Sequence, residues 1–310
     1  MSRSSAQTSG WAPSRALLSS ATVAAASGLL ATRVRGGAPK AALAVGAAAG
    51  LAVAANEAAG KPVPFLRWSF LRMMVGMRHL TREWQVGDGR EDALAAYVAE
   101  HARRDDIDDV IRVIDEFCHQ QSFMMNVGDE KGELLDAALR KARPKRVLEL
   151  GAYCGYSALR MARATDPDTL ISTVEFSAAN AEIARRNLDH AGVAHRVEVV
   201  VGSIGDGGQT LRHLRTVSGL GEGDLDFVFL DHAKDSYLSD LDLIEGEGWL
   251  HPGSVAVADN VGFPGAPEYR AHMREQEGRT WRTVEHKTHV EYQSLVPDLV
   301  LESTYLGGRG

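Results

Sequence analysis

The stretch that decides the fold is KRVLELGAYCG, residues 145–155. Residues 147–150 (VLEL) are apolar except for Glu149, and glycines at positions 151 and 155 follow at once. Strands buried on both faces of a parallel sheet have this nearly continuous apolar character, and glycines let the backbone turn tightly and approach a ligand closely. The stretch therefore predicts a strand of a parallel sheet with a binding site at its carboxyl end.

Similar apolar runs recur along the chain beyond this stretch, with helical stretches between them. They lie at 170–175, 196–201, 225–230 and 254–259. The stretch between the first two, 177–191, is expected to be a helix with Ser177 as its N-cap and Gly192 as its stop. Alternation of strands and helices over five units predicts a doubly wound α/β sheet.

Two more strand-like runs, 282–290 and 298–305, follow the last unit without a clear helix between them, and we expect them to pair antiparallel. Upstream of the first strand, apolar residues between positions 107 and 118 recur at helical spacing. The predicted fold class is therefore α/β: a Rossmann-like, doubly wound, mostly parallel sheet of seven strands with helices on both faces, preceded by N-terminal helices.

The composition limits the classes of protein to which the chain can belong. Of the 310 residues, 45% are hydrophobic and 24% are charged, which is a globular composition. The net charge of −7 argues against a general nucleic-acid-binding surface, which needs an excess of lysine and arginine. Two cysteines, Cys118 and Cys154, cannot form a disulfide framework or a four-ligand zinc site, and they fit a reducing, intracellular compartment.

The charge divides the chain into a basic leader, residues 1–62, and an acidic remainder. The leader carries six lysines and arginines and one acid, hence +5, so the rest of the chain carries −12. Its two apolar runs, 16–31 and 41–55, are shorter than the ~20 residues that a membrane-spanning helix needs. Four interpretations stay open: a membrane anchor, which we favour, a cleaved targeting sequence, a secretory signal peptide and a low-complexity tail.

A basic amphipathic linker helix is predicted for residues 63–87, between the leader and a domain at 88–310. Within it, the run 65–83 (FLRWSFLRMMVGMRHLTRE) interleaves apolar and aromatic residues with four arginines. Such a helix can lie in a membrane interface, or its apolar face can pack on the domain. We expect membrane association through residues 16–83; the alternative is a soluble cytoplasmic or organellar protein after removal of the leader.

The loop at 151–155 indicates the kind of ligand. Its Gly-x-x-x-Gly spacing lacks the Gly-x-Gly-x-x-Gly arrangement that seats a dinucleotide pyrophosphate. The second strand ends in Glu175, 24 residues beyond Gly151, where an acid can accept hydrogen bonds from both hydroxyls of a ribose. A nucleoside without phosphate, bound by a Rossmann-like sheet, points to S-adenosylmethionine.

Polar residues end two of the later strands. Asp231 follows the run 225–230, and Asp259 with Asn260 closes the run 254–259. Because the carboxyl ends of parallel strands meet at one edge of a sheet, we expect these three side chains to converge. Hard oxygen ligands without a nearby thiolate suit Mg²⁺, which keeps positions open for water and substrate.

Four segments, together with the Glu-Tyr pair at 291–292, resemble the catechol O-methyltransferase family. They are MNVGDEKG (125–132), VLELGAYCGYSALRMAR (147–163), FLDHAKDSYL (229–238) and ADNVGFPGAP (258–267). The resemblance covers roughly residues 88–308 and leaves the leader out. The family includes membrane-anchored forms with an apolar N-terminus.

The resemblance implies roles for individual residues. Asp231, Asp259 and Asn260 would hold Mg²⁺. Lys234 would act as the general base, and Glu291 would hydrogen-bond the second hydroxyl of a catechol. The positions that would contact the cosubstrate are Met125 on the methyl side, Val127, Glu149, Gly151, Tyr153, Ser157, Glu175, Asp231 and His232. Those that would contact the acceptor are Phe123, Lys234, Asn260, Glu291 and Pro264, the last beside the acceptor ring.

Three positions depart from the family pattern. The family's two tryptophan walls fall on Phe123 and Ala233, so one wall is smaller and the other is missing. A serine that contacts the adenine falls on Ile204, with Ser203 one place earlier. The metal and base positions are intact, which supports the reaction more strongly than the identity of the acceptor.

The predicted function is Mg²⁺-dependent transfer of a methyl group from S-adenosylmethionine to a hydroxyl of a catechol-like substrate. Two alternatives stay open. The chain could methylate a different, bulkier phenolic acceptor, which Ala233 and the apolar leader favour. It could also be a non-catalytic, membrane-tethered partner protein that keeps the fold. The expected partner is a small catechol or phenol and not a nucleic acid, and we expect a monomer.

Overall fold

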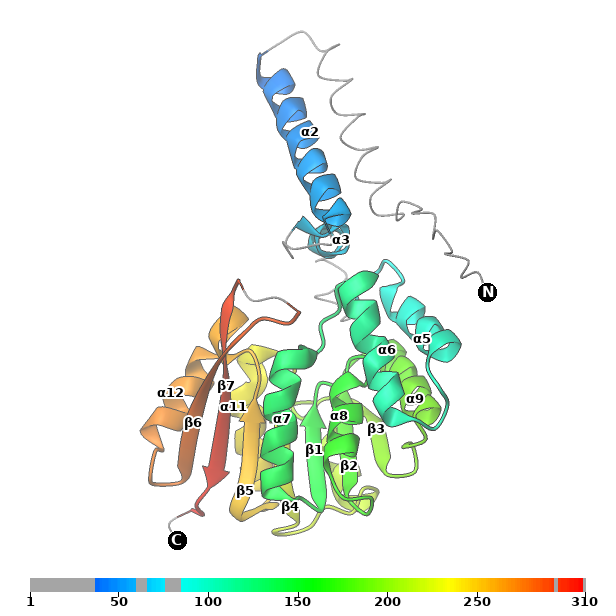
Figure 1. Cartoon of the computed structure of the whole chain (residues 1–310). Coiled ribbons are helices and arrows are strands. Elements are labelled where there is room, and N and C mark those ends of the chain that lie inside the picture. The colour runs from blue at the N-terminus through cyan, green and yellow to red at the C-terminus, as the bar shows by residue number, and fades with distance from the viewer. Residues whose placement is uncertain (1–36, 60–65, 76–84, 293–294, 309–310) are drawn as a thin grey trace, which may run out of the picture. The chain divides into compact units, whose positions relative to one another are not determined.

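The computed structural model describes residues 37–59, 66–75, 85–292 and 295–308 (Figure 1). The chain divides into two compact units, Met1–Val75 and Gly76–Gly310. The boundary between the units falls inside the predicted linker segment, 63–87, parts of which lie outside the described residues.

The described part of the first unit consists of helices. Helix α2 spans Gly37–Ala58 and is mostly alanine and glycine, and helix α3 spans Trp68–Val75. The backbone N–H of Trp68 donates a hydrogen bond to Glu57 Oε1 at 2.8 Å. The apolar run 41–55 lies within α2, and the run 16–31 lies outside the described residues. Among the helices that the structure describes, none combines the length and apolarity needed to cross a membrane.

In the part of the second unit that the structure describes, three helices precede the first strand, which agrees with the predicted N-terminal helices. They are α5 (Arg90–His101), α6 (Ile107–Gln120) and α7 (Gly128–Ala142). Helix α6 buries the apolar face that the sequence spacing predicted. Its N-cap, Asp106, accepts a hydrogen bond from the backbone of Asp109 at 3.0 Å, which satisfies one of the free N–H groups of the first turn.

A sheet of seven strands forms the centre of the second unit (Figure 1). In sheet order the strands are β3 (Val197–Val201), β2 (Leu170–Glu175), β1 (Arg146–Leu150), β4 (Leu225–Leu230), β5 (Leu250–Ala258), β7 (Pro297–Tyr305) and β6 (Trp281–His289). The first five are parallel, whereas β7 pairs antiparallel with both β5 and β6. The predicted mostly parallel sheet and its antiparallel final pair are confirmed.

Helices cover both faces of this sheet, and alternate residues of a strand therefore pack into two separate cores. Val147 of β1 belongs to the core that contains α5, α6, α7, α8 (Tyr156–Ala164) and α9 (Ala178–His190). Its neighbour Leu148 belongs to the core with α10 (Gln209–Thr216), α11 (Tyr237–Gly246) and α12 (Pro267–Glu275). The expected α9 also has its predicted ends: Ser177 caps it, and Gly192 follows it with a φ of +76°. The doubly wound α/β fold is confirmed.

Candidate active site

Most of the predicted functional residues lie at the ends of four neighbouring parallel strands or soon after them. These strands are β2, β1, β4 and β5, and their loops begin at residues 176, 151, 231 and 259. Since parallel neighbours end on the same side, the loops lie along one edge of the sheet, where ligands bind in folds of this class.

Gly151 brings the loop after β1 against the loop after β4. A Cβ atom at position 151 would lie only 2.6 Å from the carbonyl oxygen of Asp231, and the φ of Gly151 is +103°. Only glycine accommodates both the positive φ and the close approach. The residue therefore holds the predicted cosubstrate loop beside one of the predicted metal ligands.

Glu175 is buried at the end of β2, and both of its carboxylate oxygens are fixed by backbone donors. Oε2 accepts from the N–H of Tyr153 at 2.7 Å, and Oε1 accepts from the N–H of Ser177 at 2.8 Å. Burial raises the pKa of Glu175, although these hydrogen bonds oppose the rise. The Asn180 side chain and the backbone of Ala152 also hydrogen-bond this carboxylate, so Glu175 is held firmly at the edge where the ribose is expected.

Glu149, near the end of β1, is fully buried at the same edge. Its Oε2 accepts from Thr173 Oγ1 at 2.5 Å. Burial raises the pKa of Glu149 to about 8, although Ser157 and Thr173 oppose the rise. A cationic group of a ligand beside this carboxylate would favour its charged form. Glu149 and Ser157, which lies in the first turn of α8, therefore suit the amino-acid end of the cosubstrate.

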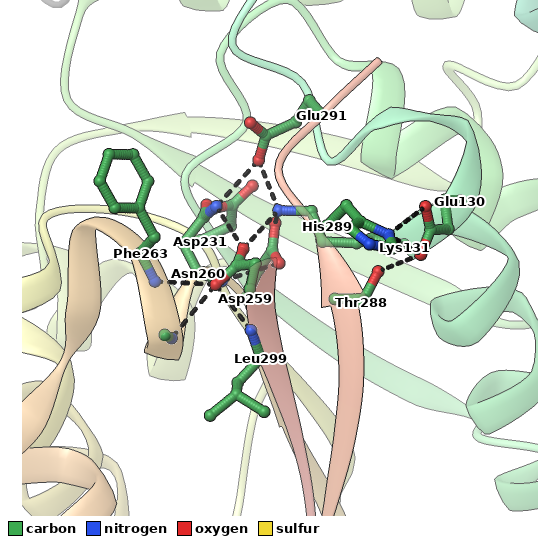
Figure 2. A network of polar contacts seen from close by, with 12 residues as sticks. Glu130, Lys131, Asp231, Asp259, Asn260, Phe263, Thr288, His289, Glu291 and Leu299 are labelled. Atoms are coloured by element: carbon green, nitrogen blue, oxygen red, sulfur yellow. Dashed lines mark hydrogen bonds and ion pairs between the residues drawn. The ribbon is translucent and has the colours of Figure 1, made fainter. Parts of the chain in front are cut away.

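The structure brings the three predicted metal ligands together through one buried network. Asp231 Oδ1 accepts from Lys234 Nζ at 2.8 Å. Asp259 is completely buried, and its Oδ1 accepts from the backbone N–H of Asn260 at 2.7 Å. Its Oδ2 makes no hydrogen bond and has an ion-pair contact with Lys131 Nζ at 2.8 Å. Figure 2 shows Asp231, Asp259 and Asn260 grouped around this ammonium.

Burial disfavours the charged forms of Asp259 and Asp231. It raises the pKa of Asp259 to about 7, against the opposing charge of Lys131, and the nearby Asp231 adds to the rise. Burial also raises the pKa of Asp231, while Lys234 and Lys131 oppose the rise. A cation near both carboxylates would favour their charged forms.

The chemistry of the donor set fits Mg²⁺. Both nitrogen-bound hydrogens of the Asn260 amide are used, since Nδ2 donates to Glu291 Oε1 and to Asp298 Oδ2, each at 2.9 Å. The carbonyl oxygen of Asn260 is thus the amide atom available to a cation, alongside two carboxylates. In the described part of the chain, no cluster of three or more His, Cys, Asp or Glu residues is placed to hold a metal ion. The predicted set differs from such a cluster, because its third member is an amide.

Lys131 is a member of the site to which sequence analysis assigned no role. Its side chain is 1% exposed, and Nζ contacts Asp259, Glu291 (2.5 Å) and Asp298 (3.2 Å). Burial alone would lower the pKa of Lys131, but the three carboxylates outweigh that effect and raise it. Lys131 lies within the MNVGDEKG segment, and the signal for its burial is its place on the inward face of α7 with Leu135.

Glu291, predicted to bind the acceptor, lies beside the predicted metal ligands. Its Oε1 accepts from Lys131 Nζ and from Asn260 Nδ2. A Cβ atom on Gly128 would lie 3.2 Å from Glu291 Cβ, so the start of α7 packs directly against this residue. Val127, a predicted cosubstrate contact, is buried at that same helix start.

Lys234, the predicted base, lies in the short helix η2 (Lys234–Ser236) after β4. Its Nζ donates to Asp231 Oδ1 and, at 2.7 Å, to the hydroxyl oxygen of Tyr237. The Tyr237 hydroxyl itself donates to the carbonyl of Leu230 at 2.7 Å. These contacts hold the lysine at the sheet edge instead of leaving it as a solvated surface charge.

His232 makes contacts that suit packing rather than metal binding. Its Nε2 lies 2.9 Å from Asp240 Oδ2, and its ring stacks on Tyr237 with centroids 5.0 Å apart. Its Nδ1 is buried without a hydrogen-bond partner in the structure. The ring is therefore fixed next to Asp231 with one polar atom still to be satisfied.

The remaining predicted contacts lie on segments that flank this edge. Phe123 is buried and Met125 is half-buried, both in the segment between α6 and α7. Pro264 lies in η3 (Val261–Gly265), directly after Asn260. Ala233 is half-buried between His232 and Lys234. Ile204 belongs to the core with α10, α11 and α12, so its apolar side chain serves packing there.

An open pocket of about 590 Å³ is lined by residues for which no role was predicted. They are Ile111, Asp115, His119, Asp129, Glu130, Glu133, Arg160, Arg163 and Tyr292. Several of its polar side chains already contact one another, for example Arg160 with Glu133 at 2.6 Å and His119 with Asp129 at 3.1 Å. We therefore place no reaction there.

Comparison with known proteins identifies the family of the chain. Residues 104–280 match the model of a family described as O-methyltransferase. A probable O-methyltransferase of Mycobacterium tuberculosis is 59% identical over 235 residues, which cover 76% of this chain and all of that protein. Mouse catechol O-methyltransferase is 39% identical over 214 residues, 69% of this chain and 78% of the relative.

A solved structure adds the cosubstrate to this comparison. The O-methyltransferase TomG from Streptomyces achromogenes, in complex with S-adenosylmethionine, matches with a TM-score of 0.52 and 26% identity. The match covers 69% of this chain and 96% of TomG. The chain therefore belongs to the family of S-adenosylmethionine-dependent O-methyltransferases.

Proposed function

We propose that this O-methyltransferase transfers the methyl group of S-adenosylmethionine to one hydroxyl of a catechol, with Mg²⁺ held by Asp231, Asp259 and Asn260. The observation that carries the proposal is the convergence of these three residues with Lys234 and Glu291 at one sheet edge. A non-catalytic scaffold has no physical need for buried carboxylates at that edge, because each costs desolvation free energy.

The loops after β1 and β2 would bind the methyl donor. Glu175, held by two backbone N–H groups, would accept hydrogen bonds from the ribose, and Glu149 would face the amino-acid end. Gly151 keeps this loop against Asp231, so the donor's methyl group would be delivered next to the acceptor side of the site. Orientation of this kind lowers the barrier of an in-line displacement.

The acceptor must lose a proton to become a good nucleophile. A free phenol has a pKa near 10. A Mg²⁺ ion held by Asp231, Asp259 and Asn260 would supply the positive charge that favours the phenolate. Lys234 Nζ, next to the predicted metal ligand Asp231, would take the proton of the reacting hydroxyl when the lysine is neutral. The positive charge of a nearby Mg²⁺ would favour that neutral form. Glu291 would accept a hydrogen bond from the second hydroxyl, as its Oε2 is not engaged by Lys131 or Asn260.

The role of Lys234 can be separated from that of its charge. Lys234→Ala is expected to lower kcat by about 10²- to 10⁴-fold with a smaller change in KM, because the proton is removed on the way to the transition state. Lys234→Arg keeps a cation that cannot act as a base at neutral pH, so it should be similarly impaired. Steady-state kinetics on a catechol would check both. Wild-type kcat in Lys234→Arg would contradict the proposed base.

A bulkier phenolic acceptor is the second candidate, and Ala233 is the observation that favours it. The small side chain at this half-buried position leaves space where the related family has an indole. An aromatic contact contributes about 0.5–1.5 kcal/mol beyond the area that it buries.

Ala233→Trp therefore serves as a test of acceptor size. KM for a small catechol should fall roughly 2- to 10-fold, since 1.4 kcal/mol corresponds to tenfold. Bulky catechols should lose efficiency, because the indole would occupy the space that they fill. A panel of unsubstituted and substituted catechols would measure this shift. If the variant folds and weakens small and bulky acceptors alike, another side chain already fills the space.

A further inference from the structure

The carboxylate of Asp298, at the start of β7, lies at the centre of the buried network but has no role in the reaction described above. Its side chain is fully buried. Oδ1 accepts from three backbone N–H groups: Gly262 at 3.1 Å, Phe263 at 2.9 Å and Leu299 at 2.7 Å. Oδ2 accepts from two side chains, Lys131 at 3.2 Å and Asn260 at 2.9 Å. The two oxygens therefore serve different partners.

The division between the two oxygens matters for the orientation of the Asn260 amide. An amide can present either its oxygen or its nitrogen to a given side, and only its partners decide which. Asp298 Oδ2 and Glu291 Oε1 both accept from Nδ2 and so hold the nitrogen away from a cation. Figure 2 shows Asn260 between Glu291 and the start of β7, next to Asp259. In the proposed reaction Glu291 also hydrogen-bonds the acceptor through Oε2, whereas Asp298 is bonded only to groups of this chain.

We propose that Asp298 is a positioning residue that fixes the amide of Asn260 with its carbonyl oxygen toward the cation. This inference rests on the proposed Mg²⁺ site. Lys131 supports the arrangement because its buried ammonium compensates the charges of Asp298 and of Glu291. Partners one step removed from a metal typically change its affinity 10- to 100-fold when they are mutated.

Asp298→Asn tests the orientation directly. The oxygen of the new amide would stay with the three backbone N–H groups, so its NH₂ group would face Asn260 and Lys131 in place of Oδ2. Two donors would then oppose each other, and the Asn260 amide would be driven to turn its oxygen away from the cation. Titration of the full chain with Mg²⁺ alone, followed by calorimetry, should show a Kd weaker by about 10- to 100-fold. Binding of S-adenosylmethionine without metal should change less than about 2-fold, because its contacts lie on other loops.

Glu130→Gln is the matched control, because it removes a negative charge without removing a partner of the Asn260 amide. Glu130 neighbours Lys131 in sequence, and its carboxylate contacts Thr288 at 2.7 Å and His289, not Asn260. Glu130→Gln removes one negative charge from the same region, and the Mg²⁺ Kd should stay within about 3-fold of wild type, since the effect of a distant charge is screened. An effect as large as that of Asp298→Asn would mean that bulk charge, not orientation, controls affinity, and would overturn the proposal.

The double variant Asn260→Asp/Asp298→Asn reverses the hydrogen bond between the two positions, so that residue 298 donates and residue 260 accepts. A carboxylate at 260 needs no orientation, and the amide at 298 can donate to it, so the Mg²⁺ Kd should return to within about 3-fold of wild type. If Asp298→Asn alone does not fold, the double variant serves as the test. A folded double variant whose Mg²⁺ Kd is more than about 30-fold weaker than wild type overturns the proposal. Wild-type affinity in Asp298→Asn also overturns it. A wild-type chain that binds no Mg²⁺ overturns the proposed metal site itself, which is a distinguishable failure.

Discussion

Asp259→Ala is expected to lower methyl transfer to a catechol by about 10³-fold or more, because it removes one of two anionic ligands from the proposed Mg²⁺ site. Asp259 is fully buried, and its Oδ2 contacts Lys131 Nζ at 2.8 Å. The affinity for S-adenosylmethionine should change less than about 3-fold, since the proposed donor contacts lie after β1 and β2. Labelled-donor turnover and calorimetry would measure the two effects separately.

A carboxylate at the opposite end of the sheet provides the control for this variant. Asp226 accepts hydrogen bonds from the backbone N–H groups of Lys145 and Arg146, at 2.7 and 2.9 Å, near the start of β1. Asp226→Ala can lower stability but should leave kcat within about 2-fold of wild type, because it touches no residue of the site. Turnover by Asp259→Ala at the level of Asp226→Ala would contradict the role given to Asp259.

Gly151→Ala is expected to lower the free energy of unfolding by about 2–4 kcal/mol, because a strained φ and an atomic overlap act together. The added Cβ would lie 2.6 Å from the Asp231 carbonyl oxygen at a φ of +103°. Relief of that overlap requires the loops after β1 and β4 to separate, so donor affinity should fall by about tenfold or more.

Gly253→Ala isolates the backbone strain from the overlap. Its φ of +106° nearly equals that of Gly151, but nothing lies within 4 Å of a Cβ at this position. Strain alone should cost roughly 1–2 kcal/mol and leave donor affinity unchanged. Thermal unfolding and donor titration of both variants would check this. Equal effects in the two variants would show that the close approach at Gly151 is unimportant.

The fold was largely predictable because the strands carry a strong local signal. Residues such as Val147 and Leu148 are buried on opposite faces, which gives strands their continuous apolar runs. The start of β5 was not predicted: it begins at Leu250, four residues before the apolar run at 254–259. Pro252 and Gly253 interrupt the pattern there, and the pairing with β4 shifts register between Leu225 and Phe227. Pairing with β4 fixes the first residues of β5, whose own sequence gives little indication of a strand.

The site was predictable only where it followed the strand ends. Asp231 and Asp259 could be located from strand order, because parallel strands end on one side. Lys131 and Asp298 could not, since they lie 167 positions apart and meet only in the folded chain. A lysine on the inward face of α7 is a weak signal until its carboxylate partners are known. The orientation of the Asn260 amide likewise depends on contacts that no local pattern encodes.

The measurement that tests the central claim most directly is the initial rate of methyl transfer from labelled S-adenosylmethionine to catechol by the full chain, with Mg²⁺ and with a chelator. The account predicts O-methylated catechol in the presence of Mg²⁺, a loss of about 100-fold or more in the chelator, and recovery when Mg²⁺ is restored. An unchanged rate in the chelator would contradict the role of the metal. The absence of any methylated catechol from an enzyme that binds the donor would contradict the proposed acceptor.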